Sequence, residues 1–225
     1  MKEIKKGFQS KSVKLIMVLL CFSFFVAIAS PIINPEPVYE NIPAKMPEKA
    51  VIVQKTLTAE EQREQESKAA FLKAYKVFMH PRCMNCHPKG DVPLQGDDSH
   101  AHLQNVVRGK DGKGMYAMKC KNCHQDANLD APETPPGNPH WQMPPADKPM
   151  VFQGKTPRQL ALHFKDNNFT GFKDLNDMIK HVDEETLVLS GFAPPPGLAK
   201  IPMSHKEFVD AVKEWIAKGA AVPDK

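Results

Sequence analysis

Two copies of one short pattern constrain this chain more than any other feature. The first, "CMNCH", starts at Cys83, and the second, "CKNCH", starts at Cys120. The residues that the pattern singles out are Cys83, Cys86 and His87 in the first copy and Cys120, Cys123 and His124 in the second. Because the same residue types recur in the same order, one chemistry has to account for both copies.

Several chemistries use paired cysteines. Zinc needs four tetrahedral ligands, which the four cysteines of the two motifs could supply as thiolates. A redox dithiol would accompany a βαβ pattern, which is absent here, and disulfides are possible in an exported protein. None of these readings explains the histidines. Histidine makes up 9 of the 225 residues, so its appearance after both pairs by chance is roughly a 1 in 600 event.

Covalent haem attachment uses every residue of the pattern. In Cys-x-x-Cys-His, the two thiols add to the vinyl groups of one porphyrin and the histidine binds the iron. The sequence therefore predicts two covalently bound haem c groups. The attachment residues are Cys83, Cys86, Cys120 and Cys123, and the iron ligands include His87 and His124.

With both motifs in place, the chain resembles a dihaem c-type cytochrome. The segment leading into Cys83 and the terminal "EFVDAVKEWIAKGA" look like the first and last helices of small cytochrome c domains. The stretch from "FMHPRCMNCHPKGDVPLQGDD" to "WIAKGAAVP" is also similar to a bacterial family often labelled as the cytochrome subunit of isoquinoline 1-oxidoreductase. That resemblance implies electron acceptance from a molybdenum dehydrogenase.

The N-terminal segment, residues 1–29, indicates export. A basic start precedes the apolar run "LIMVLLCFSFFVAIA", which is the order found in secretory signal peptides, and Ala27-Ile28-Ala29 offers a cleavage pattern. If the apolar run extends to residue 33, residues 15–33 approach the length of a membrane anchor. The lysines before the run keep the N-terminus inside. Cleaved or anchored, the rest of the chain is expected on the periplasmic side of the inner membrane.

The rest of the chain divides by composition. The chain carries a net charge of +4, which the basic start accounts for, so the exported part is near neutral and nothing argues for nucleic acid. Residues 30–55 are rich in proline and predict an extended tether. Residues 56–225 remain as the dihaem cytochrome c domain.

Helical patterns stand on both sides of a long irregular stretch. Thr58 and Glu61 fit a capping box at the start of a helix that Pro81 should end. Its expected apolar face is Phe71, Leu72, Tyr75, Phe78 and Met79. Further helices are expected after Thr156-Pro157, around the apolar positions Leu175, Met178, Ile179 and Val182, and from Ser204 to a stop at Gly219.

Between these helices, residues 88–155 are dense in glycine, proline, asparagine and aspartate. Such a segment forms neither a long helix nor a central strand, and a loop this long needs another source of order. Covalently held haem would supply the missing apolar core. The predicted fold class is therefore mainly α, with cytochrome c-like helices and extensive coil wrapped around two covalently bound haems.

The second axial ligand of each iron sets its potential and reactivity. Four side chains compete for this role: His80, His100, His102 and Met143. His80 and His102 are the preferred iron ligands, and at most one of His100 and His102 should face a given iron. Met143 is the rival, because "HWQMPP" is a proline-stiffened loop. The later histidines, such as His181, are expected at the surface, and the basic run near Arg108 is expected as a solvated loop.

These expectations favour an exported dihaem cytochrome that transfers electrons between periplasmic or membrane redox partners, for example a dehydrogenase or a respiratory complex. Three alternatives stay open. The chain could be a peroxidase-like haem enzyme with one open axial site, the cytochrome subunit of a molybdenum dehydrogenase complex, or a zinc-stapled binding module without a redox role.

Overall fold

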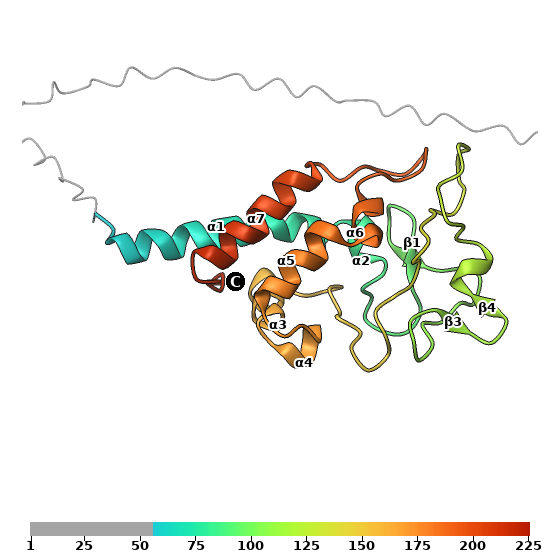
Figure 1. Ribbon diagram of the computed structural model, residues 1–225, viewed down its shortest axis with the longest axis horizontal. Helices are drawn as coiled ribbons and strands as arrows, with labels where there is room; N and C mark the ends of the chain where they lie inside the picture. The colour runs from blue at the N-terminus through green and yellow to red at the C-terminus, as the bar shows by residue number, and fades with distance from the viewer. Residues whose placement is uncertain (1–55) are drawn as a thin grey trace, which may run out of the picture. The chain divides into compact units, whose positions relative to one another are not determined.

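A computed structural model describes residues 56–225, which form a mainly helical structure with little strand (Figure 1). The expected signal or anchor (1–29) and tether (30–55) lie outside the described residues. The elements are α1 (Ala59–Phe78), α2 (Pro81–Met84), β1 (Leu94–Gln95), β2 (His100–Ala101), β3 (Gly114–Met115), β4 (Met118–Lys119), η1 (Cys120–Asn122), α3 (Pro157–Phe164), α4 (Asn167–Thr170), α5 (Leu175–Glu184), α6 (Thr186–Gly191) and α7 (His205–Ala217). From residue 56 onward, no helix is long and apolar enough to cross a membrane.

Helix α1 begins and ends where the sequence predicts. The Thr58 hydroxyl accepts from the Glu61 amide and the Glu61 carboxylate accepts from the Thr58 amide, which completes a capping box. The helix stops at Phe78, and His80 is extended, as expected for a residue that precedes a proline. The predicted apolar face of this helix is wrong at one position, because Leu72 is exposed. Ala74 and Val77 are buried instead.

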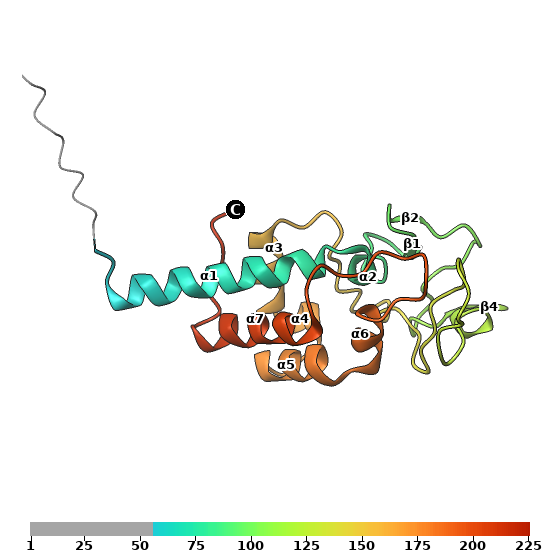
Figure 2. The same ribbon diagram turned by 90° about the horizontal axis from the view of Figure 1, so that it is seen from above.

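Helix α7 lies alongside α1, as both views show (Figures 1 and 2). It starts with a second capping box between Ser204 and Glu207. The Trp215 ring packs against Phe71 with their centroids 4.8 Å apart, and the buried Ser67 hydroxyl of α1 donates to the Trp215 carbonyl at 2.8 Å. Gly219 then takes a φ of +103° just beyond the helix, a conformation that favours glycine.

The remaining helices complete one core of aromatic and aliphatic side chains. α3 starts at a capping box between Thr156 and Gln159 with Pro157 in its first turn, as expected. α5 contributes Met178 and Val182, and α7 contributes Trp215, the largest buried side chain in residues 56–225, together with Phe208. The fully enclosed members with relative exposures of at most 1% include Phe71, Ala74, Val77, Leu160, Ala161, Met178, Phe208, Val212 and Trp215.

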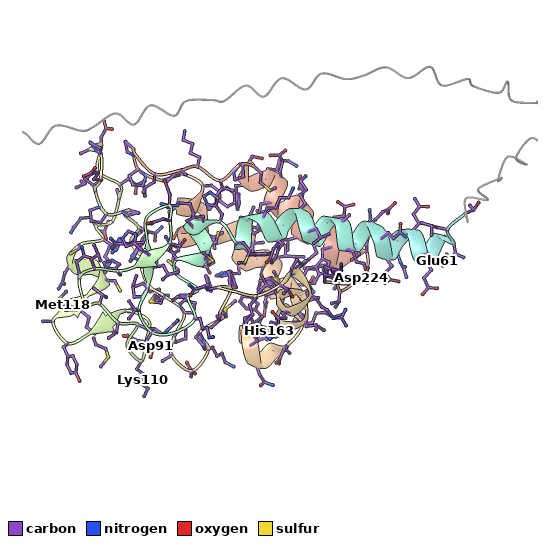
Figure 3. All side chains as sticks on the ribbon, turned by 180° about the vertical axis from the view of Figure 1, so that it is seen from behind. Glu61, Asp91, Lys110, Met118, His163 and Asp224 are labelled. Atoms are coloured by element: carbon purple, nitrogen blue, oxygen red, sulfur yellow. The ribbon has the colours of Figure 1, made fainter. Side chains whose placement is uncertain are left out.

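We call residues 56–87 and 150–225 the helical region and residues 88–149 the loop region. The loop region has two short antiparallel pairs, β1 with β2 and β3 with β4, and otherwise consists mainly of coil. The hydrophobic core draws all its members from the helical region. In Figure 3, Asp91, Lys110 and Met118 mark the loop region, while Glu61, His163 and Asp224 mark the helical region. The expected long coil without an apolar core is therefore confirmed.

Candidate functional site

The first motif lies at the edge of the helical region, on the short helix α2. Pro81 occupies the first turn of α2, and the His80 ring caps it, with Nδ1 accepting from the Arg82 amide at 3.2 Å. Cys83 lies within α2 and packs against the hydrophobic core. Cys86 and His87 follow in the turn after the helix, so Cys86 comes three residues after Cys83, close to one helical turn.

His87 is held from two sides by the segment that enters α3. Its Nδ1 lies 2.8 Å from the carbonyl oxygen of Met150. Its ring stacks on the buried Phe152, with centroids 3.8 Å apart and planes inclined by 4°. The Phe152 amide in turn donates to the His87 carbonyl at 2.9 Å. Phe152 belongs to the core, so the core itself fixes the orientation of the His87 ring.

The second motif repeats this environment in the loop region. Cys120 is buried at the start of η1, Cys123 is exposed, and His124 follows. The Nδ1 of His124 lies 2.7 Å from the carbonyl oxygen of Pro136. Its ring stacks on Trp141, with centroids 4.0 Å apart and planes inclined by 8°.

The same two contacts therefore orient both motif histidines and leave one ring nitrogen of each available to a metal. A carbonyl can only accept, so Nδ1 carries the proton and the lone pair remains on Nε2. The pKa of His87 is lowered to about 3, mainly by burial; the hydrogen bond to Met150 opposes this shift, and the charges of His181 and Arg108 add to it. Burial likewise lowers the pKa of His124 to about 4. Both rings are neutral at physiological pH, the state that binds metals.

Three of the four motif thiols, those of Cys83, Cys86 and Cys120, are kept protonated. Burial raises the pKa of Cys83 to about 12 and that of Cys86 to about 11. Burial also raises the pKa of Cys120. Reactive or metal-binding cysteines need the thiolate, which their surroundings usually stabilise. These surroundings instead suit an uncharged sulfur, such as the thioether that joins a cysteine to a porphyrin.

The alternatives to haem attachment fit less well. In residues 56–225, no three His, Cys, Asp or Glu side chains converge closely enough to hold a metal ion by themselves. All four motif cysteines are free thiols. A zinc-stapled module would need the four cysteines around one metal ion, and a disulfide framework would need them bonded in pairs. The residues present fit two haem groups better than either arrangement.

The two motifs lie near each other in space. The Leu94 amide donates to the carbonyl of Asn85, inside the first motif, at 2.9 Å. The His102 amide donates to the carbonyl of the adjacent Pro93, also at 2.9 Å. The His102 ring in turn lies with its centroid 6.4 Å from that of His124 in the second motif. Arg108 acts on both Cys86 and His87 from the loop region. The fold thus brings the two motifs together although a long stretch of coil separates them along the chain.

The four candidate axial ligands fall into different places. His80 serves as the cap of α2. His100 is exposed, and both its ring nitrogens have partners, Asp98 at 2.6 Å and Gln95 at 3.0 Å. His102 lies beside the second motif, with its ring centroid 6.4 Å from that of His124. Met143 is buried, and its amide donates to the Gly112 carbonyl at 2.9 Å.

Arg108 corrects one expectation. The basic run around it is expected as a solvated loop, but the Arg108 side chain is fully buried. Its guanidinium donates to the carbonyls of Gly90 and Pro144 at 2.8 Å each and to the Asp91 carboxylate at 3.3 Å. It thereby joins the segment that follows the first motif to a later segment that follows the second.

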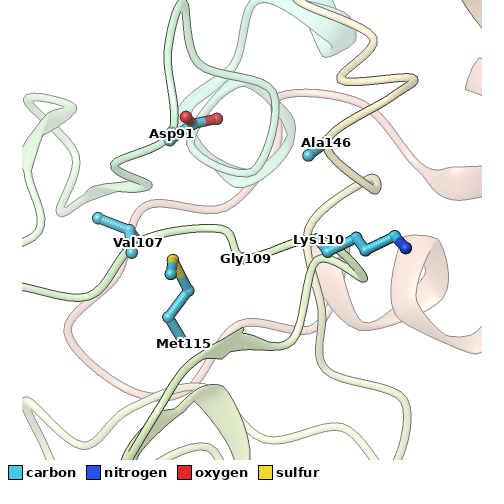
Figure 4. A pocket seen from close by; sticks show the side chains of 6 residues that line it. All are labelled: Asp91, Val107, Gly109, Lys110, Met115 and Ala146. Carbon is cyan, nitrogen blue, oxygen red and sulfur yellow. The ribbon is translucent and has the colours of Figure 1, made fainter.

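A pocket of about 400 Å³ lies next to this junction, with Met115 on one side and Asp91 on the other (Figure 4). The residues that line it are Asp91, Val107, Gly109, Lys110, Met115 and Ala146. No motif cysteine or histidine is among them, so this pocket is a hollow beside the motifs.

Sequence reasoning missed the residues that orient the motif histidines. The carbonyls of Met150 and Pro136 carry no side-chain signal, because any residue offers a carbonyl. Phe152 and Trp141 have a weak signal, as aromatic residues within a segment of glycine and proline. His181, expected at the surface, is partly buried on α5, and its charge acts on His87.

Comparisons with known proteins identify no relative of this chain. No protein-family model matches the chain, and no curated protein or solved structure is significantly similar to it. The functional argument therefore rests on the two motifs and their surroundings.

Proposed function

We propose that this chain is an exported dihaem c-type cytochrome that transfers electrons between redox partners. Cys83 and Cys86 attach one haem and Cys120 and Cys123 the other, while two histidines, one per motif, each bind one iron. Bound haem iron supplies reversible one-electron oxidation and reduction. The chain's own contribution is to hold two such groups near each other and to fix their ligands.

The observation that carries the proposal is the repeated environment of His87 and His124. Each ring donates its Nδ1 proton to a backbone carbonyl and stacks on an aromatic side chain, Phe152 or Trp141. A hydrogen bond of this kind fixes the tautomer and orientation of a metal-binding histidine. A chance Cys-x-x-Cys-His pattern gives no reason for two unrelated segments to build this arrangement twice.

Electron relay is favoured because the segment through Leu94, Pro93 and His102 joins the two motifs in space. The N-terminal pattern supports a position on the periplasmic side of the inner membrane, either anchored or released after cleavage. Partners would then be periplasmic or membrane redox proteins, such as a dehydrogenase or a respiratory complex.

The test is the haem content of the full-length chain produced in bacteria with a cytochrome c maturation system. We expect the denatured protein to stain for haem and its mass to exceed that of the polypeptide by two haem groups. Replacing Cys83 and Cys86 by alanine should remove one haem, and replacing Cys120 and Cys123 should remove the other. A mass equal to that of the bare polypeptide would refute the proposal.

A further inference from the structure

The His102 ring lies at a distance from His124 that suits two imidazoles bound to one metal ion. The two ring centroids are 6.4 Å apart and the ring planes are inclined by 61°. Metal–imidazole bonds are about 2 Å long and a ring centre lies roughly 1 Å beyond its nitrogen, so two imidazoles on one metal have centroids roughly 6 Å apart. The observed separation matches that geometry, and it is too long for a direct hydrogen bond between the rings.

The backbone fixes His102 in this position. β1 pairs with β2 through Leu94 with Ala101 and Gln95 with His100. The pairing ends at Ala101, and the His102 amide then donates to the Pro93 carbonyl at 2.9 Å. His100 therefore stays at the exposed edge of the hairpin, while the His102 ring turns toward the second motif.

Within the described part of the chain, one nitrogen of the His102 ring has no hydrogen-bond partner and is available to bind a metal. Its Nδ1 is buried, and within residues 56–225 it makes no hydrogen bond of good geometry. A buried polar atom without a partner destabilises the fold, so a ligand for this nitrogen would relieve that cost. His100 differs, because Asp98 and Gln95 already occupy both its nitrogens.

We infer that His102 and His124 are the two axial ligands of the same haem iron, the one attached at Cys120 and Cys123. This inference rests on the proposed function. It makes the second haem a bis-histidine centre, in which no axial position is open to a substrate. A histidine ligand in place of a methionine also keeps the potential of such a haem low.

The experiment compares axial ligation in full-length matured protein and its variants. Low-temperature near-infrared magnetic circular dichroism reports the ligand pair of each low-spin haem, and mass reports the number of haems. We expect a bis-histidine band in the unmodified protein. His102→Ala should keep both haems but turn one of them high-spin, and added imidazole should restore the low-spin state.

Two further variants sharpen the result. His102→Met retains a possible ligand, so it serves if His102→Ala fails to accumulate; it should replace the bis-histidine band by a histidine–methionine band and raise one midpoint potential. His100→Ala is the matched control, two residues away, and should leave the spectrum unchanged.

Two outcomes would overturn the assignment. One is a His102→Ala protein with two haems and an unaltered near-infrared spectrum. The other is loss of the low-spin state when Met143→Leu is made in the Cys83→Ala/Cys86→Ala protein, where only the second haem remains, which would make Met143 its ligand. Both outcomes leave the dihaem proposal intact, whereas a chain without covalent haem would end the dihaem proposal itself.

Discussion

The helical region and the loop region bury different kinds of side chain. The helical region encloses an aromatic cluster around Phe71, Phe208 and Trp215. Apart from Pro88, the side chains that the loop region buries are polar or contain sulfur, namely Arg108, Asn138, Met143 and Cys120. Since apolar burial is the main driving force of folding, the helical region supplies most of that driving force and the loop region little of it.

This difference gives the two otherwise similar motifs different support. Phe152, which stacks on His87, belongs to the hydrophobic core. Trp141, which stacks on His124, is only partly buried and lies outside that core. The first site is thus organised by the protein, and under the proposed function the second is organised largely by the haem it holds.

The largest expected effect comes from removing each haem separately. Without the haem at Cys120 and Cys123, we expect backbone amides of the loop region to lose hydrogen-exchange protection by orders of magnitude, because little apolar surface is buried there. Amides of α1 and α7 should keep their protection. Hydrogen exchange followed by mass spectrometry on the Cys120→Ala/Cys123→Ala protein measures both.

The matched control is the Cys83→Ala/Cys86→Ala protein. It should lose protection mainly near α2, because the core holds the adjoining segments in place. Equal loss in both regions from either variant would contradict the division drawn here.

The next largest effect should come from the core of the helical region. Trp215 is 1% exposed and packs on Phe71, so Trp215→Ala should lower the free energy of unfolding by about 3–5 kcal/mol. Leu72→Ala, at an exposed position of α1, should cost far less. Denaturant unfolding followed by helical circular dichroism compares the two, and a similar cost for both would show that the core is not where the stability lies.

The contrast between regions also explains how much the sequence could predict. The three capping boxes at Thr58, Thr156 and Ser204 are local, because donor and acceptor lie three residues apart. The capping boxes at Thr58 and Ser204 were therefore predictable from the residues themselves. At Thr156 only the cap position was predicted. Leu72 failed because the choice of buried face depends on where α7 packs.

In the loop region only the motifs and the absence of regular structure were predictable. Backbone carbonyls tie His87 to Met150 and His124 to Pro136, across 63 and 12 positions respectively. Such contacts depend on the path of the coil and leave no residue-type signature. Arg108 looked like part of a solvated basic run, because its burial depends on two distant carbonyls.

Arg108 offers a smaller but specific effect within the loop region. Arg108→Gln should remove the hydrogen bonds from the guanidinium to the carbonyls of Gly90 and Pro144, and hydrogen bonds to a charged group contribute about 1.5–3 kcal/mol each. Exchange should therefore accelerate in the loop region and not in α7. Lys110→Gln, which removes an exposed positive charge nearby, is the control. If both substitutions have the same small effect, Arg108 does not organise the junction.

The smallest expected effect tests the connection between the regions. Asn138 is buried in the loop region, and its Nδ2 donates to the Thr186 carbonyl at the start of α6 at 2.9 Å. Its Oδ1 accepts from the His140 amide at 2.8 Å. Asn138→Ala removes both hydrogen bonds, each with a net contribution of about 1 kcal/mol.

Asn122 provides a control of the same residue type. It is exposed, and its Nδ2 donates to the Ala117 carbonyl within the loop region at 2.7 Å. We expect Asn138→Ala to raise exchange in both α6 and the segment around His124, and Asn122→Ala to act only near β4. If Asn138→Ala leaves α6 unchanged, the regions are energetically independent there, and the loop region depends still more on its haem.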